Sequence, residues 1–350
     1  MILAVLGFLQ IVASLSWPAL AINPKQDKEV VCFVYHRFGD HRYKSTNISL
    51  TNFESHLSYL KENDFQVLTS DQALDYLQSD NPPRKTAVIS IDDGYKSFFE
   101  NGLPLLIKYG YPASLYINTE TVGVGGDFMD WSELKEANSK GIEIGNHTDS
   151  HAYFLNMPEE SRYKVFEEEL ERSQKLIESH LGKLPTTFAY PYGELDPKMR
   201  DLVENQGFKG AFAQNSGVLS GSTDLMRCPR FPMSEAYAEL DKFIMKANMH
   251  AFSNLSESPV SFVIADGEKR PELVLEITNE EILINQINCF IQGSECIMQT
   301  EQVGEHRTKI TIQPTSAIGK RRRTLYTITA KDGNGRWHWY SHLWINPKVK

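Results

Sequence analysis

The stretch AVISIDDGYKSF (residues 87–98) contains an apolar, β-branched run that leads directly into two adjacent carboxylates and a glycine. The run has the composition of a strand buried on both faces, as in a parallel sheet. Two carboxylates at close range each make the other harder to ionise. A buried strand that ends in Asp92 and Asp93 therefore requires a partner that stabilises neighbouring negative charges.

Residues 29–247 repeat this kind of strand in alternation with amphipathic helices. Phe53, Leu57 and Leu60, for example, are spaced to form one apolar helix face. Repeated strand–helix units indicate a parallel sheet, and this number of units favours a barrel over an open sheet. The expected strands are EVVCFVY, TAVISI, ASLYIN, IEIGNH, TTFAYPYG, GFKGAFA and RCPRFPM; further helices are expected up to Leu105, in MDWSELKEANSKG, and near residues 158–180 and 197–206.

From about Ser256 the pattern changes to short alternating runs with almost no helical periodicity. These runs are PVSFVI, ELVLEI, TKITI, LYTITA and WHWYSHLW. They predict a small all-β, sandwich-like module. We therefore expect a barrel domain over residues 22–254 and an all-β accessory domain over residues 255–350.

Residues 1–21 are apolar and uncharged and end in Ala19-Leu20-Ala21, the small-x-small pattern that precedes a signal-peptidase cut. They predict a signal peptide, a mature chain from near Ile22 and an extracytoplasmic (periplasmic or secreted) location. Because the segment before the apolar run lacks Lys and Arg, an uncleaved membrane anchor is the alternative, and only then would the chain associate with a membrane.

The net charge of -9, from 36 Lys and Arg against 45 Asp and Glu, argues against nucleic acid as a partner. Of the four cysteines, Cys289 and Cys296 are close enough in sequence to form a local disulfide. Cys32 lies inside a predicted strand and is expected to be a small core residue.

Polar residues follow several of the predicted barrel strands, where the chemistry of such barrels collects. His147 and His151 are four residues apart, so on a helical turn both imidazoles would share one face and one metal. With Asp93 as third ligand, the cation would offset the repulsion and leave Asp92 ionised as a general base. The alternative is a plain Asp-Gly turn beside ordinary histidines.

The motifs SIDDGY, HTDSH and YPYGE, in this order and spacing, resemble the polysaccharide deacetylase family (carbohydrate esterase family four, with a nodulation-type deacetylase domain) over residues 29–234. The opening VYHRFGD and the appended module are most similar to the branch that deacetylates exported poly-N-acetylglucosamine. The resemblance implies an α/β fold, a distorted (β/α) barrel with fewer than eight strands. It also implies metal-dependent hydrolysis of N-acetyl groups on an extracytoplasmic amino-sugar polysaccharide, with zinc preferred and cobalt, nickel or iron as alternatives.

Matched position by position, the resemblance assigns roles to individual residues. The metal ligands are Asp93, His147 and His151, and Asp92 is the general base. Tyr192 supplies a backbone N–H for the oxyanion, and His36 is an active-site histidine of the exopolysaccharide branch. Thr148 is the hydroxyl that steadies the histidine turn and, with Pro191 and Trp131, is expected on the substrate side.

Two departures from the family pattern concern the general base and the general acid. The usual arginine is Ala189 here, so Arg227 or Arg230 is expected to replace it, unless these are ordinary strand-end arginines. The last catalytic histidine has only a weak counterpart in His250, which leaves His36 or a water on the metal as the proton donor.

Aromatic and basic clusters admit two interpretations. Around the rim, Tyr43, Tyr95, Trp131 and Tyr153 either stack on sugars or serve in packing. In the β module, core packing is favoured over a carbohydrate platform for Trp337, Trp339, Tyr340 and Trp344. The run GKRRR (residues 319–323) is either a solvated loop or a contact for an acidic partner.

The alternatives to poly-N-acetylglucosamine deacetylation are deacetylation of peptidoglycan or of an O-acetylated glycan, and a catalytically weak glycan-binding or export scaffold. The missing arginine and the unassigned general acid favour the scaffold, whereas the intact aspartate and histidine set opposes it. Cell-envelope export machinery is a candidate partner besides the polysaccharide.

Overall fold

The structure is a computed structural model that describes residues 28–253, 255–278 and 282–349. The predicted signal peptide, residues 1–21, lies outside the described residues. Within the described ranges, no helix has both the length and the apolar character needed to cross a bilayer.

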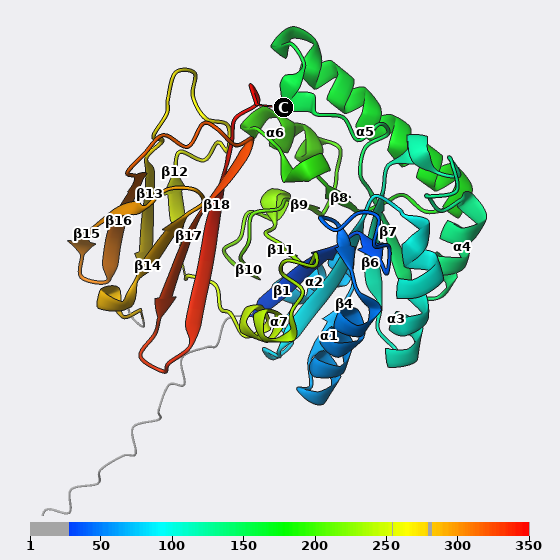
Figure 1. Ribbon diagram of the computed structural model, residues 1–350, viewed down its shortest axis with the longest axis horizontal. Coiled ribbons are helices and arrows are strands. Elements are labelled where there is room, and N and C mark those ends of the chain that lie inside the picture. The colour runs from blue at the N-terminus through cyan, green and yellow to red at the C-terminus, as the bar shows by residue number, and fades with distance from the viewer. Residues whose placement is uncertain (1–27, 254, 279–281, 350) are drawn as a thin grey trace, which may run out of the picture.

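The largest sheet in the described part of the chain has nine strands, seven of which follow one another in the order β10-β1-β5-β6-β7-β8-β9. These seven are β1 (Glu29–Tyr35), β5 (Thr86–Asp92), β6 (Ala113–Ile117), β7 (Ile142–Asn146), β8 (Thr187–Ala189), β9 (Gly210–Phe212) and β10 (Val218–Ser220). Short β4 (Gln66–Leu68) pairs with β5, and β11 (Phe231–Pro232) pairs with β1. All pairs are parallel except β1–β10. The sheet curls as Figure 1 shows, which confirms the predicted distorted barrel.

The segment of residues 228–233 spans the opening between β9 and β1. Cys228 pairs with β9 through backbone bonds to Ala211 and Ala213, at 2.8 and 2.9 Å. Immediately after it, β11 lies parallel to the end of β1. The predicted strand RCPRFPM is therefore mostly a bridge, and it carries residue 230 across the top of the barrel.

The helices are α1 (Leu50–Glu62), α2 (Ser70–Gln78), α3 (Leu103–Tyr109), α4 (Trp131–Ser139), α5 (Glu159–Leu181), α6 (Pro197–Asn205) and α7 (Leu240–Ala247). Figure 1 shows α1, α3, α4 and α5 along the outside of the curled sheet. Sequence analysis missed β4 and α2. The start of α2 is marked by a capping box, in which Thr69 and Gln72 satisfy each other's backbone N–H groups.

The barrel core consists of the apolar side chains that point from these strands and helices toward one another. Phe33, Phe53 and Phe98 are fully buried, and so is Cys32, as predicted.

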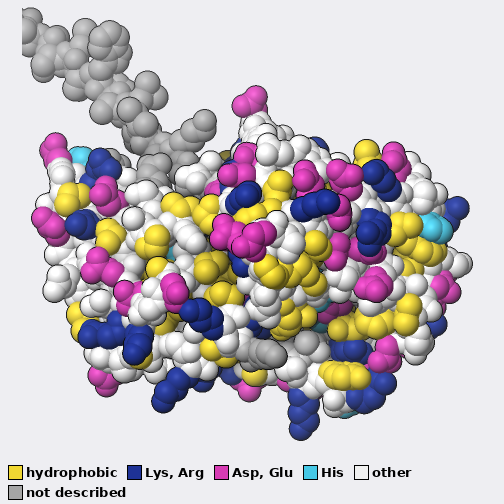
Figure 2. Space-filling view, turned by 90° about the horizontal axis from the view of Figure 1, so that it is seen from above, with side chains coloured by type: hydrophobic (Ala, Val, Ile, Leu, Met, Phe, Trp, Pro, Cys, Tyr) yellow, Lys and Arg dark blue, Asp and Glu magenta, His cyan; other side chains and the backbone are white. Residues whose placement is uncertain are grey.

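On the face drawn in Figure 2, basic and acidic side chains are interspersed, with apolar side chains between them.

Two sheets form the C-terminal sandwich, ordered β12-β13-β16-β15 and β14-β17-β18. Their strands are β12 (Ser256–Ser258), β13 (Leu273–Thr278), β14 (Asn288–Ile291), β15 (Cys296–Gly304), β16 (Arg307–Pro314), β17 (Arg323–Lys331) and β18 (Trp337–Ile345). Four of the five predicted runs lie in strands. The prediction of a strand at the fifth run, PVSFVI, was wrong. This run makes only a single bridge, at Val263, and it begins with Pro259, which has no N–H to donate to a strand partner.

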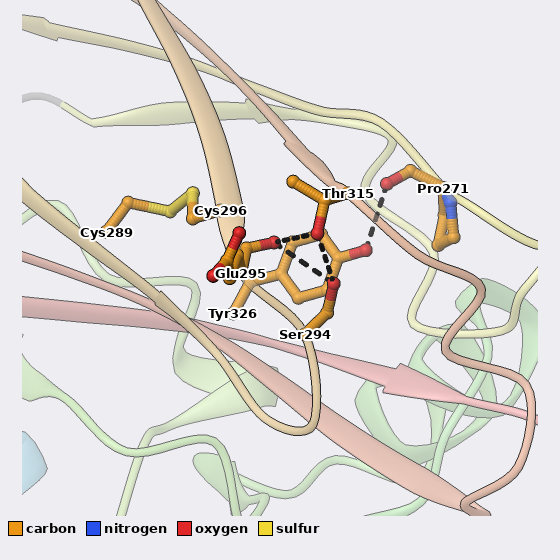
Figure 3. The surroundings of a disulfide bond; sticks show 7 residues. All are labelled: Pro271, Cys289, Ser294, Glu295, Cys296, Thr315 and Tyr326. Atoms are coloured by element: carbon orange, nitrogen blue, oxygen red, sulfur yellow. Dashed lines mark hydrogen bonds between the residues drawn. A yellow bond between two sulfur atoms is a disulfide. The ribbon is translucent and has the colours of Figure 1, made fainter.

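The two cysteines that are close in sequence form a disulfide. It joins Cys289 of β14 to Cys296 of β15, and therefore links the two sheets of the sandwich (Figure 3). Beside it, the hydroxyls of Ser294 and Thr315 bond to the carbonyl of Glu295.

Strand β18 attaches the sandwich to the barrel. Its backbone bonds to His250 through Trp337 and Trp339, and its end bonds to Phe262. The Trp339 ring also lies edge-on to Phe231 of the barrel, at 5.5 Å between centroids. The core interpretation of the β-module aromatics thus holds for Trp339, Tyr340 and Trp344, whereas Trp337 is 38% exposed.

A buried histidine fixes the last residue of β1 below the rim. His56 Nε2 is 2.8 Å from the Ala238 carbonyl, which can only accept, so Nε2 carries the proton. Nδ1 then accepts from the Tyr35 hydroxyl at 3.1 Å. Burial lowers the pKa of His56 to about 4, although the hydrogen bond to the Ala238 carbonyl acts in the opposite direction.

We predict that His56→Gln makes the fold less sensitive to acid. His56 takes up a proton near pH 6.5 in the unfolded chain but only near pH 4 in the folded chain. The free energy of unfolding therefore decreases as the pH is lowered through this window. By about pH 4.5 the loss attributable to His56 is about 2 kcal/mol. Urea unfolding should be measured for both proteins at neutral pH and at about pH 4.5. Between these two pH values, the free energy of unfolding should fall by about 2 kcal/mol more in wild type than in the variant. An unchanged difference would show that His56 is not the sensor.

Candidate metal centre and catalytic site

The site lies at the rim where the parallel strands of the barrel end. β1 ends before His36, β5 ends on Asp92, β7 ends before His147, and β8 ends before the turn that contains Tyr192. Because these strands run in the same direction in one curled sheet, their carboxyl ends open on one side of the barrel. The sheet therefore collects residues from four separate parts of the sequence.

Three of the predicted residues, which we call the Asp-His-His cluster (Asp93, His147 and His151), converge on one point. Asp93 Oδ1 is 3.4 Å from His147 Nε2 and 3.3 Å from His151 Nε2. All three candidate ligand atoms lie within 4.8 Å of one another. Two imidazole nitrogens and a carboxylate oxygen at this spacing have the composition of a three-residue catalytic metal site.

The hydrogen bonds of His147 show that the cluster suits a cation. His147 Nδ1 is 2.7 Å from the carbonyl of Ala189, so Nδ1 carries a proton, and in the metal-binding form of the ring Nε2 presents a lone pair. That lone pair faces a carboxylate oxygen, which is also an acceptor. Two acceptors at this distance need a proton or a cation between them, and the donor set matches zinc or another first-row divalent metal.

The two histidines are not on a helical turn, so that prediction was wrong. Thr148 and His151 have positive φ angles of 66° and 55°, which no helix contains. The loop is held instead by side chains: Asn146 Oδ1 accepts from the Thr148 N–H at 2.8 Å, and Thr148 Oγ1 accepts from the His151 N–H at 3.1 Å. Thr148 is fully buried, so its hydroxyl steadies the loop and has no surface for a substrate.

Asp92 forms an ion pair with Arg230 on the bridging segment. The two guanidinium nitrogens bond to the two carboxylate oxygens at 2.7 and 2.8 Å, and neither residue is exposed. Arg230 also donates to the Ala213 carbonyl at 2.9 Å. It therefore takes the place expected for the missing family arginine, whereas Arg227 pairs with Glu257 elsewhere.

These contacts keep both carboxylates ionised. Burial disfavours the charged form of Asp92, but the charges of Arg230 and His147 outweigh it and lower its pKa. Burial likewise opposes ionisation of Asp93, but the neighbouring histidines, His36 among them, hold its pKa well below the usual range. Burial and the charge of His147 lower the pKa of His151 to about 4, which leaves its ring neutral and able to bind a metal.

The turn after β8, residues 190–194, is strained, and we call it the Tyr192 turn. Tyr192 and Gly193 both have positive φ, at 59° and 69°. A Cβ on Gly193 would lie 2.5 Å from the backbone nitrogen of Gln214, so glycine is required there. The Tyr192 ring lies beside His151, with centroids 4.4 Å apart. Pro191 is buried in the turn, without a free surface.

The remaining predicted residues lie in different places. His36 is partly buried at the rim, close enough for its charge to lower the pKa of both Asp92 and Asp93. The Trp131 indole stacks on His180 at 4.1 Å, so its face is already used in packing between α4 and α5. His250 pairs with Glu29, the first residue of β1, at the opposite end of the strand from His36, so it is not the general acid.

Rim contacts that sequence analysis did not identify involve Arg37. Its guanidinium lies 3.5 Å from the Tyr95 ring centroid and 4.0 Å from that of Tyr43. Tyr95 also stacks on Phe128 at 5.1 Å. Sequence analysis had placed Tyr43 and Tyr95 at the rim, but the only signal for Arg37 was its position directly after His36.

Comparisons with known proteins agree with this site. Residues 79–211 match the family model described as Polysaccharide deacetylase, which includes the Asp-His-His cluster and Asp92. The chain is 27% identical over 216 residues to the poly-beta-1,6-N-acetyl-D-glucosamine N-deacetylase of Staphylococcus aureus (strain MRSA252), covering 58% of this chain and 73% of that protein.

Two solved structures have the same barrel. IcaB from Ammonifex degensii superposes with a TM-score of 0.55 at 26% identity, over 62% of this chain and 97% of that one. The Streptococcus pyogenes deacetylase PplD, at 18% identity, shares the fold with a TM-score of 0.58, over 63% of this chain and 99% of that one. Residues 79–211 form a polysaccharide deacetylase domain, and the relatives and structural neighbours indicate that the chain is a deacetylase enzyme.

Proposed function

We propose that this protein is a metal-dependent hydrolase that removes N-acetyl groups from a polysaccharide of the poly-N-acetylglucosamine type outside the cytoplasm. The observation that carries the proposal is the division of roles between adjacent carboxylates: Asp92 binds Arg230, and Asp93 faces two histidines. The substrate class is supported by the Staphylococcus aureus relative, whose name specifies poly-beta-1,6-N-acetyl-D-glucosamine. The location is supported by the apolar segment at residues 1–21.

The Asp-His-His cluster would hold the metal, with zinc as the expected ion and cobalt, nickel or iron as alternatives. A bound divalent cation would lower the pKa of a water toward about 7 and polarise the acetyl carbonyl.

The chain's own residues supply the rest of the reaction. Arg230 keeps Asp92 ionised and orients it. Asp92 takes a proton from the attacking water while the water oxygen bonds to the carbonyl carbon. The Tyr192 N–H donates to the oxyanion, a contact whose loss typically costs about 3 kcal/mol. His36 gives a proton to the nitrogen as the C–N bond breaks, which releases acetate and a free amine.

The scaffold alternative loses one of its two supports. It depended on the absence of the family arginine, and Arg230 makes the bidentate contact to the base from another part of the chain.

We predict that the zinc-loaded mature protein releases acetate from N-acetylglucosamine oligomers, and that chelation abolishes the release. Asp92→Asn should lower turnover at least about 100-fold, because general base catalysis contributes that much, while the metal content stays at wild-type level. Asp201→Asn, an exposed carboxylate on α6, is the matched control and should leave turnover unchanged. Oligomers that bind without acetate release under any metal would contradict the proposed activity and favour a scaffold.

We predict further that His147→Ala and His151→Ala lose the metal, whereas His306→Ala, an exposed histidine before β16, retains it. Metal content after dialysis, measured by elemental analysis, gives the answer without an activity assay. Retention of one equivalent by both cluster variants would rule out this site.

The Asp92–Arg230 pair gives a stability prediction. Arg230→Met leaves a buried carboxylate unpaired and should cost about 3–5 kcal/mol. The double variant Asp92→Asn/Arg230→Met should lose less than the sum of the single variants, because no charge then remains buried. Arg307→Met, which breaks an exposed pair with Glu276, should unfold at nearly the wild-type urea concentration. Additive losses would show that the pair is not coupled.

A further inference from the structure

Two arginines of the β module reach the Tyr192 turn of the barrel. Arg322 and Arg323 come from the basic run GKRRR at the start of β17, far in sequence from residues 190–194. The default expectation for this run was a solvated loop. The contacts below show instead that part of it is bonded to the site.

Arg322 is anchored in the barrel by a bidentate ion pair. Its Nε and Nη2 donate to the two carboxylate oxygens of Glu194 at 2.7 and 2.6 Å. Its Nη1 donates to Asn156 Oδ1 at 2.9 Å. The side chains of Arg322 and Glu194 are only 10% and 4% exposed, so this pair is screened from water, unlike a surface ion pair.

Arg323 bonds to the strained residue itself. Its Nη1 donates to the Tyr192 carbonyl at 2.7 Å. A positive φ at a residue other than glycine persists only when surrounding contacts hold it. A charged donor fixed on this carbonyl restrains the peptide plane that follows Tyr192, and thereby the ψ angle of that residue.

Stacked side chains continue from the metal ligands to Arg322. The His151 ring lies against Tyr192, and Tyr192 stacks parallel on Tyr153, with centroids 3.7 Å apart and an interplanar angle of 4°. The guanidinium of Arg322 lies 4.2 Å from the centroid of Tyr153. The Tyr153 ring therefore contacts both Tyr192 and Arg322. Each contact in this series is direct, so the position of Tyr192 depends on the β module at its backbone and through its ring.

The module is held firmly enough to act in this way. Backbone bonds join β18 to His250 and Phe262. Leu343 and Ile345 of β18 also belong to the same apolar cluster as Phe188 and Tyr190 of the barrel.

We propose that Arg322 and Arg323 are positioning residues of the deacetylase site, and that the β module is part of the catalytic unit because it holds the Tyr192 turn. The catalytic part of this proposal rests on the proposed function, in which the Tyr192 N–H serves the oxyanion. Neither arginine acts on the substrate directly; both act through Tyr192.

The test compares Arg323→Ala with Arg321→Ala, since both remove one exposed basic side chain from the same loop. For Arg323→Ala we expect kcat to fall at least about tenfold, a fraction of the effect of losing an oxyanion donor outright. KM and the melting temperature should stay near wild type, and Arg323→Lys should restore part of kcat. Arg321→Ala should match wild type in every measurement.

Hydrogen exchange of the intact, metal-free protein gives a second measurement that needs no activity. The backbone amides of Tyr190, Tyr192, Gly193 and Glu194 should exchange faster in Arg323→Ala than in Arg321→Ala. If wild type releases no acetate, the proposed function fails, while faster exchange still supports the positioning of the turn by Arg323. Unchanged exchange together with unchanged kcat would overturn the inference. A rise in KM alone would overturn it too, because it would assign Arg323 to polymer binding.

Discussion

The buried ion pair between Asp92 and Arg230 is the interaction on which the site depends. Taking two charges out of water is costly, and the cost is offset here by bidentate geometry and by the Ala213 carbonyl, which accepts from the same guanidinium. Arg230 reaches Asp92 because residues 228–233 bridge β9 and β1. The closure of the barrel and the ionisation of Asp92 thus have the same structural origin.

With Asp92 satisfied by Arg230, Asp93 is left to face the histidines. The backbone of Asp93 has a positive φ of 75°. Further positive φ angles occur at Thr148 and His151 in the loop after β7, and at Tyr192 in the turn after β8. Strain of this kind is found where surrounding structure determines it, often at functional sites. In this protein the surrounding contacts come from buried side chains, such as Thr148, and from the β module.

The β module therefore has a structural explanation that composition did not provide. Its aromatic residues mainly fill cores, either within the sandwich or against Phe231 of the barrel. Its basic run is divided between exposed residues and Arg322, which is mostly screened from water by its pair with Glu194. The barrel and the module share an apolar cluster, so the two parts are packed together. This packing is what allows side chains of the module to hold residues at the rim of the barrel.

The sequence by itself determined the elements with strong local patterns. Short β-branched apolar runs predicted the barrel strands, apolar spacing predicted α1, and motif order indicated a resemblance to the polysaccharide deacetylases and the Asp-His-His cluster. It misjudged features that depend on long-range contacts. The helical turn proposed for His147 and His151 does not form, because Asn146 and Thr148 side chains hold a positive-φ loop instead. PVSFVI looked like a strand by composition, but its proline cannot join a ladder.

Only the tertiary structure decided which arginine serves Asp92 and what the GKRRR run contacts. Both partnerships join residues more than 100 positions apart in the chain: 138 between Asp92 and Arg230, and 128 between Glu194 and Arg322. The local sequence pattern around a charged residue does not identify the residue with which it forms an ion pair. The partner is set by how the bridge and the module are placed in space, and by the free energy of leaving a buried carboxylate unpaired.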